Sequence, residues 1–575
     1  MAGLQHLAVV LAGTAVAGLG AGAQPGQIVQ LTGPGACVSQ LVTDGICAEA
    51  RALNGPDALT VSPDGRTVYA ASFGVAPHVS GNTGSIAVLT RNRTTGRIRQ
   101  PDGAAGCVGD LEDGCGEARG IEGTSAVATS ADGRYVYATG FVSGSVASFA
   151  RAAAGSLTQL PSSDGCVGGG ISEGCAAGPG LRGAAGVAIS PDGTNLYVAS
   201  FASGAVAAFA RDTRTGRIRQ LAGDAACIAE QDDEGAEDDD GVAVESCRPG
   251  KGLIGSTEVA VSPDGKNVYV LARDSIAVFR RGSGGGLTQL PAAQGCLNLD
   301  GSGGCTAVPQ LENGLDLAIG PDGRTLYVAS YLPGSIALLR RDPDTGALAP
   351  LTTLASPGLD GVAGLTVTPD GDGLYAVSPY QDAVLAFRRK ADGRLERLRG
   401  AAACVSDVER TDACAHGQVL SRASAAAVSP DGRHLYVSSV EPIGISCACG
   451  RELGSLSVFT RSAASVSLAA PRTAAAVRAG TAFRITAAVQ TTARPVTVVC
   501  SASVGGRSIH ARGGYTAGAA VCTGFVPRGA AGTRLAGMVR VTAAGAARTA
   551  SFSFPIRQAA QRATAPTVAG RGPMK

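Results

Sequence analysis

The chain has 575 residues, which predicts two or more domains because a single hydrophobic core rarely serves so long a chain. Hydrophobic residues make up 45% of it, yet aromatic residues make up only 4% and Trp is absent; with 83 glycines, this composition favours an all-β fold with cores of Ala, Val, Ile and Leu. The formal net charge of +2, without a basic stripe between aromatic residues, gives no support to nucleic-acid binding.

A secretion signal over residues 1–23 is the first predicted element. Residues 7–23 form an apolar run that ends in Ala-Gly-Ala, a cleavage pattern that makes Gln24 the expected first residue of the mature chain. The segment before the run contains His6 but no Lys or Arg, which leaves open a start codon assigned too far downstream. We expect a secreted or cell-surface protein with no membrane span in the mature chain, because no later segment is long and apolar enough.

Sixteen cysteines fall into eight close pairs, and together with an export signal they predict disulfides formed outside the cytoplasm. The pairs are Cys37/Cys47, Cys107/Cys115, Cys166/Cys175, Cys227/Cys247, Cys296/Cys305, Cys404/Cys414, Cys447/Cys449 and Cys500/Cys522. No pair has the C-x₂-C spacing of zinc sites and the five histidines are scattered, so zinc binding has little support.

A unit of four short strands recurs seven times in the first part of the chain. An Asp-Gly turn, usually Ser-Pro-Asp-Gly, joins the first two strands, since Pro presets φ and Gly accepts the left-handed conformation. The turn aspartates are Asp64, Asp132, Asp192, Asp264, Asp322, Asp370 and Asp431. A third strand of the type SIAVF and a fourth such as SLTQL (156–160) follow, and seven such units predict a seven-bladed β-propeller.

Each unit repeats a tyrosine in its second strand and an arginine at the end of its third. The tyrosines are Tyr69, Tyr137, Tyr197, Tyr269, Tyr327, Tyr375 and Tyr436, and the arginines are Arg91, Arg151, Arg211, Arg281, Arg341, Arg389 and Arg461. We expect each Tyr to pack between blades with its hydroxyl in water. We expect each Arg to make a structural hydrogen bond or ion pair rather than to contact a ligand.

The fourth strand of the seventh unit is missing at the end of the repeat. The seventh unit ends near Arg461, whereas a copy of that strand, GQIVQL (26–31), stands at the start of the mature chain. We therefore predict that this N-terminal strand completes the last blade and closes the ring, which also removes an exposed sheet edge. The predicted propeller domain covers residues 26–463.

Two strings recur through these units: S-P-D-G-x-x-[VL]-Y-[VA], then G-S-[IV]-A-[VL]-[FL]-x-R followed by T-G. They resemble the YVTN/lactonase-like seven-bladed β-propeller superfamily over residues 26–463, in an extracellular, disulfide-rich variant. The resemblance implies the fold. It is less specific for activity, because the superfamily combines sugar- or muconate-lactone enzymes with surface-layer and other extracellular proteins.

For the enzyme members, the resemblance implies a His-containing segment just before the innermost strand and His, Arg and Glu side chains in the central funnel. The matching segments here contain no His: GPDAL (55–59), GTSAV (123–127), GAAGV (183–187), GSTEV (255–259), NGLDL (313–317), GVAGL (361–365) and ASAAA (423–427). The propeller histidines are His78, His416 and His434, of which we expect only the first two to be able to reach the ligand face. We assign no catalytic residue.

Just before the innermost strand, most blades carry Ala or Gly, but blades four and five carry Glu258 and Asp316. These are our candidate ligand-binding residues, because adjacent acids at a funnel mouth could bind Ca²⁺ or a cationic ligand. The alternative is that they accept backbone N–H bonds or face water. The acidic run 230–240 lacks the frame of an EF-hand, so a solvated loop is expected, with loose Ca²⁺ binding as the alternative; we predict no other cofactor or metal.

Six blade-to-blade connections each contain one cysteine pair, and we expect them on the ligand face with the loops between second and third strands. Stapled loops there favour stability against proteases and equally a rigid recognition surface. Cys447 and Cys449 lie in such a loop with one residue between them; we expect a strained disulfide, with a redox role as the alternative.

Residues 464–557 alternate as strands and contain Cys500/Cys522, which predicts an immunoglobulin-like β-sandwich that lacks the usual core Trp. We expect it to be a spacer, wall-contact or adhesion module. Residues 558–575 are expected to form a disordered tail.

These features predict a monomeric binding or scaffold protein that acts through its disulfide-stapled loop face. The expected partner is an extracellular protein, a glycan or a small molecule, and not nucleic acid. The alternative is a lactonase-type hydrolase or isomerase that acts on a sugar or muconate lactone in the central funnel.

Overall fold

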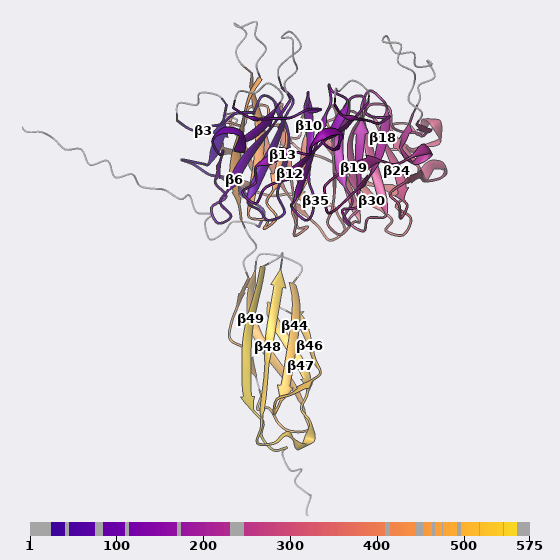
Figure 1. The fold of residues 1–575 in the computed structure, drawn as a ribbon. Helices are drawn as coiled ribbons and strands as arrows, with labels where there is room; N and C mark the ends of the chain where they lie inside the picture. The colour runs from indigo at the N-terminus through magenta and orange to yellow at the C-terminus, as the bar shows by residue number, and fades with distance from the viewer. Residues whose placement is uncertain are drawn as a thin grey trace, which may run out of the picture. The chain divides into compact units, whose positions relative to one another are not determined.

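The computed structural model describes residues 25–40, 45–74, 84–109, 114–169, 174–230, 247–408, 414–442, 452–462, 466–473, 475–491, 496–516, 518–543 and 546–559. Within these ranges there is no α-helix, and so no helix that could cross a membrane. The predicted signal peptide, the Cys447/Cys449 pair, His78 and nearly all of the acidic run 230–240 lie outside them, as does the tail from residue 560 on. The chain divides into two compact units, Met1–Ser462 and Ala463–Lys575 (Figure 1).

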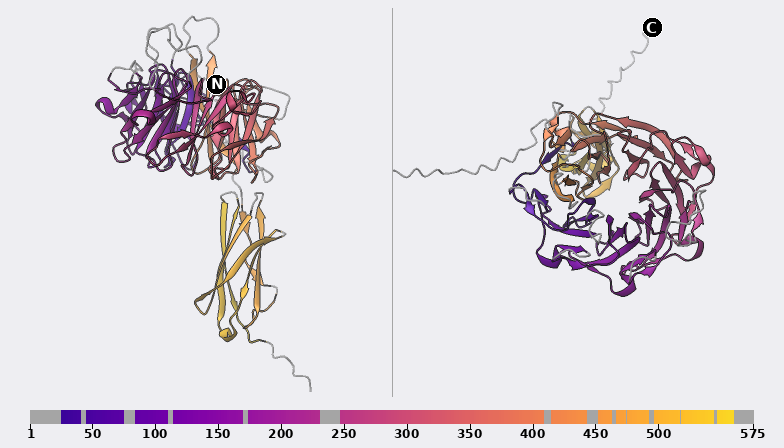
Figure 2. Two further views of the ribbon diagram at one scale, coloured as in Figure 1. Left: turned by 90° about the vertical axis from the view of Figure 1, so that its right-hand side faces the viewer. Right: turned by 90° about the horizontal axis from the view of Figure 1, so that it is seen from above.

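Seven β-sheets in the first unit confirm the predicted seven-bladed propeller, and we number the blades from one to seven in the order of their innermost strands. These inner strands are β4 (Pro56–Val61), β10 (Thr124–Thr129), β16 (Ala184–Ile189), β22 (Ser256–Val261), β28 (Gly314–Ile319), β32 (Gly364–Val367) and β38 (Ala426–Val428). Each packs against the inner strand of the next blade, and β38 packs against β4. The inner strands thus form a closed circle, seen from above in the right panel of Figure 2.

Second and third strands extend each blade outward in antiparallel register. The second strands are β5 (Thr67–Ser72), β11 (Tyr135–Gly140), β17 (Asn195–Ser200), β23 (Asn267–Ala272), β29 (Thr325–Ser330), β33 (Gly373–Ser378) and β39 (His434–Pro442). The third strands are β6 (Ser85–Arg91), β12 (Ser145–Arg151), β18 (Ala205–Arg211), β24 (Ser275–Arg281), β30 (Ser335–Arg341), β34 (Ala383–Arg389) and β40 (Glu452–Arg461). Seven hydrophobic clusters lie one at each seam between neighbouring blades, so the core is built between sheets.

Six blades depart from the predicted four-strand unit, because their fourth strand is split and a fifth strand follows. The first piece is β7 (Ile98–Arg99), β13 (Leu157–Gln159), β19 (Ile218–Gln220), β25 (Leu287–Gln289), β35 (Leu395–Arg397) or β1 (Ile28–Gln30). The second piece begins with a cysteine: β8 (Cys107–Gly109), β14 (Cys166–Gly168), β20 (Cys227–Ala229), β26 (Cys296–Asn298), β36 (Cys404–Ser406) or β2 (Cys37–Ser39). Both pieces pair with the third strand.

The fifth strand is short and pairs in parallel with the second piece of the fourth. These strands are β9 (Gly116–Glu117), β15 (Ala176–Ala177), β21 (Arg248–Pro249), β27 (Thr306–Ala307), β37 (Ala415–His416) and β3 (Ala48–Glu49). Blade five alone among the described blades has four strands, since its outer strand β31 (Leu348–Ala355) runs unbroken along β30.

The N-terminal segment closes the ring, as predicted, and does so with three strands rather than one. β1 pairs antiparallel with β40 so that Ile28 lies opposite Arg461, and β2 pairs with the other half of β40. β3 then pairs with β2 at the edge. The edge of β40 is therefore covered by the start of the propeller's own chain.

Tyrosine, arginine and aspartate join each blade to the next at one end of every seam. At the seam between blades four and five, Arg341 Nε donates to the Tyr269 hydroxyl (2.7 Å), and its Nη2 contacts both Asp264 oxygens (3.0 and 2.9 Å). The Tyr269 hydroxyl donates to the Gly346 carbonyl (2.8 Å). The prediction of a wet hydroxyl is wrong: all seven tyrosines are fully buried, because the hydroxyl finds its partners inside the seam.

Seven of the eight predicted disulfides are formed. Six lie in the propeller, one in each blade except blade five, and join the second piece of the fourth strand to the start of the fifth. We call these six the staples: Cys37–Cys47, Cys107–Cys115, Cys166–Cys175, Cys227–Cys247, Cys296–Cys305 and Cys404–Cys414. The staples therefore hold strand against strand, and not loop against loop as expected.

The second unit consists of two sheets around one core. One sheet has the order β41-β43-β47-β46 with β42 beside β43, and the other has the order β45-β44-β48-β49. The strands are β41 (Val466–Leu468), β42 (Arg472–Thr473), β43 (Ala482–Thr491), β44 (Val496–Val504), β45 (Arg507–Ile509), β46 (Ala511–Thr516), β47 (Ala519–Phe525), β48 (Arg534–Ala543) and β49 (Ala546–Pro555). Cys500–Cys522 joins the two sheets; the immunoglobulin-like topology itself stays a prediction.

Candidate functional site

The two faces of the propeller are built from different connections. The turn face holds the Asp-Gly turns and the tyrosine–arginine–aspartate contacts. The connection face, at the opposite end of the strands, holds the blade-to-blade connections and the loops between second and third strands. On the turn face nearly the same contacts recur at every seam, which is typical of structural residues. On the connection face the connections differ in length and sequence between blades, which is typical of a ligand-binding face.

An arc of aromatic side chains follows the second strands at the connection face. Phe73, Phe141 and Phe201 stand at the same position in blades one to three, directly after β5, β11 and β17. Their ring centroids are 5.9 Å and 6.0 Å apart in sequence around the ring, with tilted planes. All three residues are half-buried.

The arc continues over blades four to six. Arg273 takes the same position in blade four, and its guanidinium carbon lies 5.8 Å from the centroid of the Phe201 ring. Tyr331 follows in blade five and contacts the ring of Tyr380 in blade six at 5.1 Å. Burial, with the neighbouring Tyr380, raises the pKa of the Tyr331 phenol. We call Phe73, Phe141, Phe201, Arg273, Tyr331 and Tyr380 the mouth arc.

Backbone hydrogen bonds fix the mouth arc beside the inner strands. The backbone N–H of each of the first five arc residues donates to a carbonyl just before the inner strand of the same blade. Examples are Phe141 to Gly123 (2.9 Å) and Tyr331 to Asn313 (3.1 Å). Gly123 and Asn313 both have positive φ. These contacts place the aromatic rings around the connection-face end of the inner-strand circle.

The large exposed hydrophobic side chains of the described propeller residues are all on the connection face. Six large hydrophobic side chains are exposed: Ile46, Ile254, Leu315, Leu332, Tyr380 and Val408. Leu332 and Tyr380 are each 62% exposed and lie in loops between second and third strands, and the other four lie in connections or at the start of β28. Large exposed apolar groups are common at binding surfaces, which makes the connection face the candidate face.

Glu258 on β22 and Asp316 on β28 both accept backbone N–H bonds, which is the alternative considered for them in the sequence; their role as ligand-binding residues stays a prediction. A β-bulge precedes each of them in β22 and β28. Asp316 Oδ2 accepts the backbone N–H of Leu365 in blade six (2.6 Å), and Oδ1 accepts that of Leu317 (2.7 Å). Glu258 Oε1 accepts the Val259 N–H (3.0 Å), while its other oxygen has no donor among the described residues.

The same position shows why other blades carry Ala or Gly there. A Cβ added to Gly186 would lie 2.8 Å from the Glu258 Cα of the next blade, and one added to Gly364 would lie 2.8 Å from the Ser424 carbonyl. Side chains in this column therefore point at the neighbouring inner strand.

Burial raises the pKa of both acids. It raises that of Glu258 to about 8, with a further contribution from the charge of Asp316. It raises that of Asp316 to about 6, against the two backbone N–H bonds that lower it. At neutral pH one carboxyl is thus protonated beside one that is ionised.

The two acids do not fit a Ca²⁺ site. Ca²⁺ takes six to eight oxygen ligands, whereas Asp316 already accepts N–H bonds on both oxygens. Across the described part of the chain, no three His, Cys, Asp or Glu side chains are grouped to hold a metal ion. The alternative Ca²⁺ prediction for 230–240 lies almost wholly outside the described residues.

The described histidines are not at the mouth arc. His416, expected to be able to reach the ligand face, is exposed on the outermost strand of blade six, the farthest strand from the inner circle. His434 is buried on the turn face, where its Nδ1 lies 2.8 Å from Arg91 Nη2. Burial, with Arg91 nearby, lowers the pKa of His434 to about 4, so it is neutral and accepts that hydrogen bond.

Cavities beside the staples offer a second type of concave surface. A cavity of about 480 Å³ lies at the junction of blades five and six, against Cys404, Cys414 and Arg397. A cavity of equal volume lies against Cys296 and Lys251 at the connection into blade four. A larger cavity of about 720 Å³ lies away from the staples, against Arg324, Arg341 and Asp392, so cavities are not specific to the staples.

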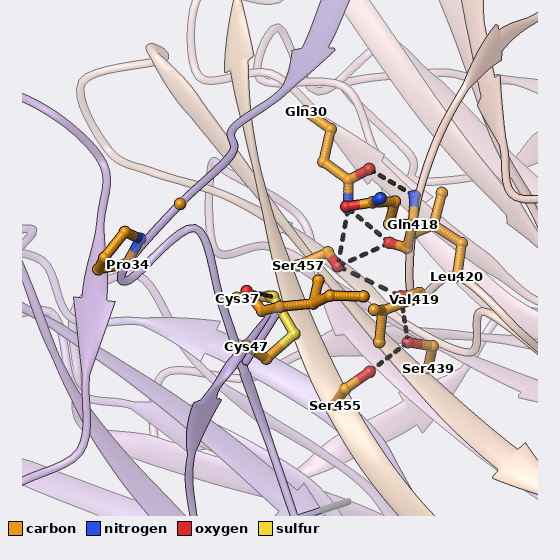
Figure 3. Close-up of a disulfide and its surroundings, with 12 residues drawn as sticks. Gln30, Pro34, Cys37, Cys47, Gln418, Val419, Leu420, Ser439, Ser455 and Ser457 are labelled. Carbon is orange, nitrogen blue, oxygen red and sulfur yellow. Dashed lines mark hydrogen bonds between the residues drawn. A yellow bond between two sulfur atoms is a disulfide. The ribbon is translucent and has the colours of Figure 1, made fainter. Parts of the chain in front are cut away.

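Glutamines at the ends of the first outer-strand pieces hydrogen-bond to the backbone of most blade-to-blade connections. In blade seven, the Gln30 side chain donates to the Gln418 carbonyl (2.6 Å) and to the Ser457 hydroxyl (3.1 Å), and accepts the Gln418 N–H (2.8 Å). Figure 3 shows this contact beside the Cys37–Cys47 staple. In blade six Arg397 replaces the glutamine and donates to the Pro357 carbonyl (2.7 Å).

The mouth arc is the feature that sequence reasoning missed. Its signal was present: the second strands read YAASF, YATGF, YVASF and YVASY, with an aromatic residue four positions after the repeated Tyr. The repeated Tyr occurs in all seven blades, which is the pattern of a structural residue. The aromatic residues after it occur in a subset, which is the pattern expected of a site rather than of a scaffold.

The propeller is similar to a known family and to solved structures. Residues 107–229 match the family model "Lactonase, 7-bladed beta-propeller". These residues run from the second outer piece of blade one to that of blade three. The match confirms the resemblance to the lactonase-like propeller superfamily. No curated protein matches the chain.

Solved structures with the same kind of fold are distant in sequence. A putative 6-phosphogluconolactonase from Bacteroides uniformis is 20% identical, with 59% of this chain and 83% of that chain covered and a TM-score of 0.42. The periplasmic gluconolactonase of Pseudomonas aeruginosa gives the same four values. The calcium-binding protein regucalcin from Agrobacterium tumefaciens is 13% identical, with 60% and 95% covered and a TM-score of 0.32.

Proposed function

We propose that this lactonase-like propeller is a secreted binding protein that holds its partner on the connection face, over the mouth arc. The observation that carries the proposal is the gathering of exposed apolar and aromatic side chains on that face. Half-buried aromatic rings can stack on a planar or sugar ring, and Arg273 can contact an anionic group. The staples hold the outer strands beneath this surface, so the surface is formed before the partner binds.

The partner we propose is a small molecule or a glycan rather than a broad protein surface. Aromatic rings in a curved row around an axis suit a compact ligand with flat faces. Sugar rings have such faces, and so do aromatic metabolites. An extracellular protein that inserts one loop into the arc is the remaining class.

Removing the Tyr380 ring tests the proposal. The side chain is 62% exposed, so Tyr380→Ala should leave the fold intact while it removes one end of the arc. Binding is measured by calorimetry and thermal shift against a panel of mono- and oligosaccharides and aromatic acids and amines. We expect at least one compound to bind with an affinity that Tyr380→Ala lowers about tenfold.

Val499→Ala is the matched control, because Val499 is 61% exposed and lies in the second unit. It should leave the affinity unchanged. If no compound binds, or if both variants bind equally well, the mouth arc is not the site.

A lactonase-type hydrolase is the second candidate, and the raised pKa of Glu258 favours it. At neutral pH the protonated Glu258 carboxyl could donate a proton to the ring oxygen that leaves as the lactone C–O bond breaks, while Asp316 stays ionised beside it. Water supplies the hydroxyl that adds to the carbonyl carbon, and the remaining proton of that water returns to the Glu258 carboxylate, so the step balances. Acid release from D-glucono-1,5-lactone, corrected for spontaneous hydrolysis, measures this activity; a rate that survives Glu258→Gln excludes this role.

A further inference from the structure

The two units of the chain carry opposite charge. Residues 463–575 contain 14 Lys and Arg and neither Asp nor Glu. The whole chain has 48 basic and 46 acidic residues, which leaves 34 basic and 46 acidic residues for 1–462. The near-neutral total therefore combines a unit of net charge +14 with one of −12. Like charges repel one another within a compact unit. A composition with basic but no acidic side chains therefore destabilises the second unit unless an anionic partner offsets the repulsion.

Three of these arginines lie together on the outer face of the five-stranded sheet. Arg484 on β43 and Arg512 on β46 both stand opposite Thr523 of β47, which places their Cα atoms about 10 Å apart in one row. Arg472 on β42 stands opposite Thr486, two residues along β43 and on the same face. All three arginines are exposed, whereas the alternate residues of β43 are buried in the core.

No carboxylate competes for these guanidinium groups within the unit. Arg512 Nε contacts His510 Nε2 at 3.3 Å. Threonine hydroxyls of Thr486 and Thr523 lie between the arginines in the register of the sheet. Phe525, two residues beyond Thr523 on the same face, is 55% exposed. The face thus combines three exposed guanidinium groups, two threonine hydroxyls and one exposed phenyl ring.

We propose that this face, which we call the arginine face, binds an anionic polysaccharide whose sugars carry carboxylate, phosphate or sulfate groups. Thirteen of the 14 basic residues are arginines, and the planar guanidinium matches such groups with two parallel hydrogen bonds. The hydroxyls suit sugar hydroxyls, and the Phe525 ring suits the apolar face of a sugar.

Two other polyanions fit less well. A lipid surface would need several exposed apolar groups together, but the arginine face has one, and the other two exposed hydrophobics of the described unit, Val499 and Met538, lie on the second sheet. Single-stranded nucleic acid is held by rows of stacked aromatic rings, and here a single ring is exposed. The proposal concerns the second unit and does not depend on the function of the propeller.

The experiment measures binding of the full chain to polygalacturonate, a polymer of sugar carboxylates, by biolayer interferometry. We compare the unchanged chain with Arg472→Gln/Arg484→Gln/Arg512→Gln. Neutral dextran, duplex DNA and phosphatidylglycerol vesicles are tested in parallel. Salt is raised from about 0.1 M to about 1 M, which shortens the Debye length from about 10 Å to about 3 Å.

We expect binding to polygalacturonate at low salt that weakens steeply as salt rises, with no binding to dextran. The triple variant should bind at least about tenfold more weakly. The matched control changes three exposed propeller arginines, Arg99→Gln/Arg219→Gln/Arg340→Gln, which alters net charge equally and should leave the affinity within about twofold.

Several results would overturn the proposal. They are the absence of binding at low salt, equal binding by the triple variant, an equal loss in the propeller control, or binding that does not respond to salt. Tighter binding to duplex DNA or to vesicles, lost in the same triple variant, would assign the face to that polyanion instead and reject the polysaccharide.

Discussion

The turn face and the connection face of the propeller treat their acids in opposite ways. On the turn face, six of the seven turn aspartates have a lowered pKa, although burial alone would raise it, because hydroxyl, backbone and arginine hydrogen bonds outweigh it. On the connection face, burial raises the pKa of Glu258, Asp316 and Asp407. Asp372, on the turn face of blade six, is an exception, because burial and the charge of Asp370 raise its pKa to about 6.

This difference separates stability from function within one repeat. The turn face uses tyrosine, arginine and aspartate at each seam. Their contacts contribute stability at neutral pH that is lost when the aspartates become protonated. The connection face keeps carboxyl groups with raised pKa values, exposed apolar groups and aromatic rings, which lower stability and suit binding.

Removing one turn-face arginine should have the largest effect. Arg341→Leu leaves Asp264 and the Tyr269 hydroxyl without their shared donor, because the Arg341 side chain is only 1% exposed and is fully bonded. We expect the free energy of unfolding to fall by about 3 kcal/mol, measured by guanidinium denaturation. Arg340→Ala, next to it but exposed, should change it by less than about 0.5 kcal/mol.

If Arg341→Leu and Arg340→Ala lowered the free energy of unfolding equally, the buried turn-face arginine would contribute no more stability than its exposed neighbour.

Removing a staple should have a somewhat smaller effect. Cys166→Ser/Cys175→Ser opens a loop of sequence separation 9, whose closure restricts the unfolded chain, so we expect a loss of about 2–3 kcal/mol in the same denaturation experiment. Blade five folds with an unbroken outer strand and no staple, so the variant should still form a propeller. Loss of the β circular-dichroism signal would mean that the staples are needed for folding itself.

Neutralising Glu258 should change how stability depends on pH. A carboxyl whose pKa is raised from 4.5 to about 8 on folding binds its proton more tightly in the folded state, so stability falls as pH rises from about 4.5 to about 8. Glu258→Gln should flatten this fall, by at most about 1.4 kcal/mol per pH unit for one proton. Denaturation midpoints measured across this range check the slope.

Asp264→Asn provides the contrast on the turn face, because its lowered pKa predicts the opposite sign, with stability lost as pH falls. If both variants shifted the profile in the same direction, the opposition between the faces would be wrong.

Much of the fold followed from the sequence because the propeller repeats itself. Seven Asp-Gly turns set the number of blades, and the missing seventh outer strand located the ring closure at residues 26–31. The split outer strands did not follow, because a break between Gln159 and Cys166 looks like an ordinary loop in the sequence. The tyrosine hydroxyls were misjudged because their partner, an arginine, lies in the next blade.

The candidate sites were harder to predict for two physical reasons. Glu258 and Asp316 could be chosen from the repeat, but a column of small residues does not tell whether it faces an axis or a neighbouring strand. The charge of the second unit was hidden because net charge was summed over the whole chain. Counted by unit, the absence of acids after residue 462 is plain in the sequence itself.

Ring closure by the N-terminal strands has a consequence for assembly. The Thr460 hydroxyl donates to the Val29 carbonyl across 431 residues of sequence, so the contacts that complete blade seven are among the most non-local in the molecule. During synthesis, the segment made first must wait for the segment made last, with its backbone groups unpaired until then. Only a full-length propeller can hide that edge, which makes closure a built-in check that distinguishes finished chains from truncated ones.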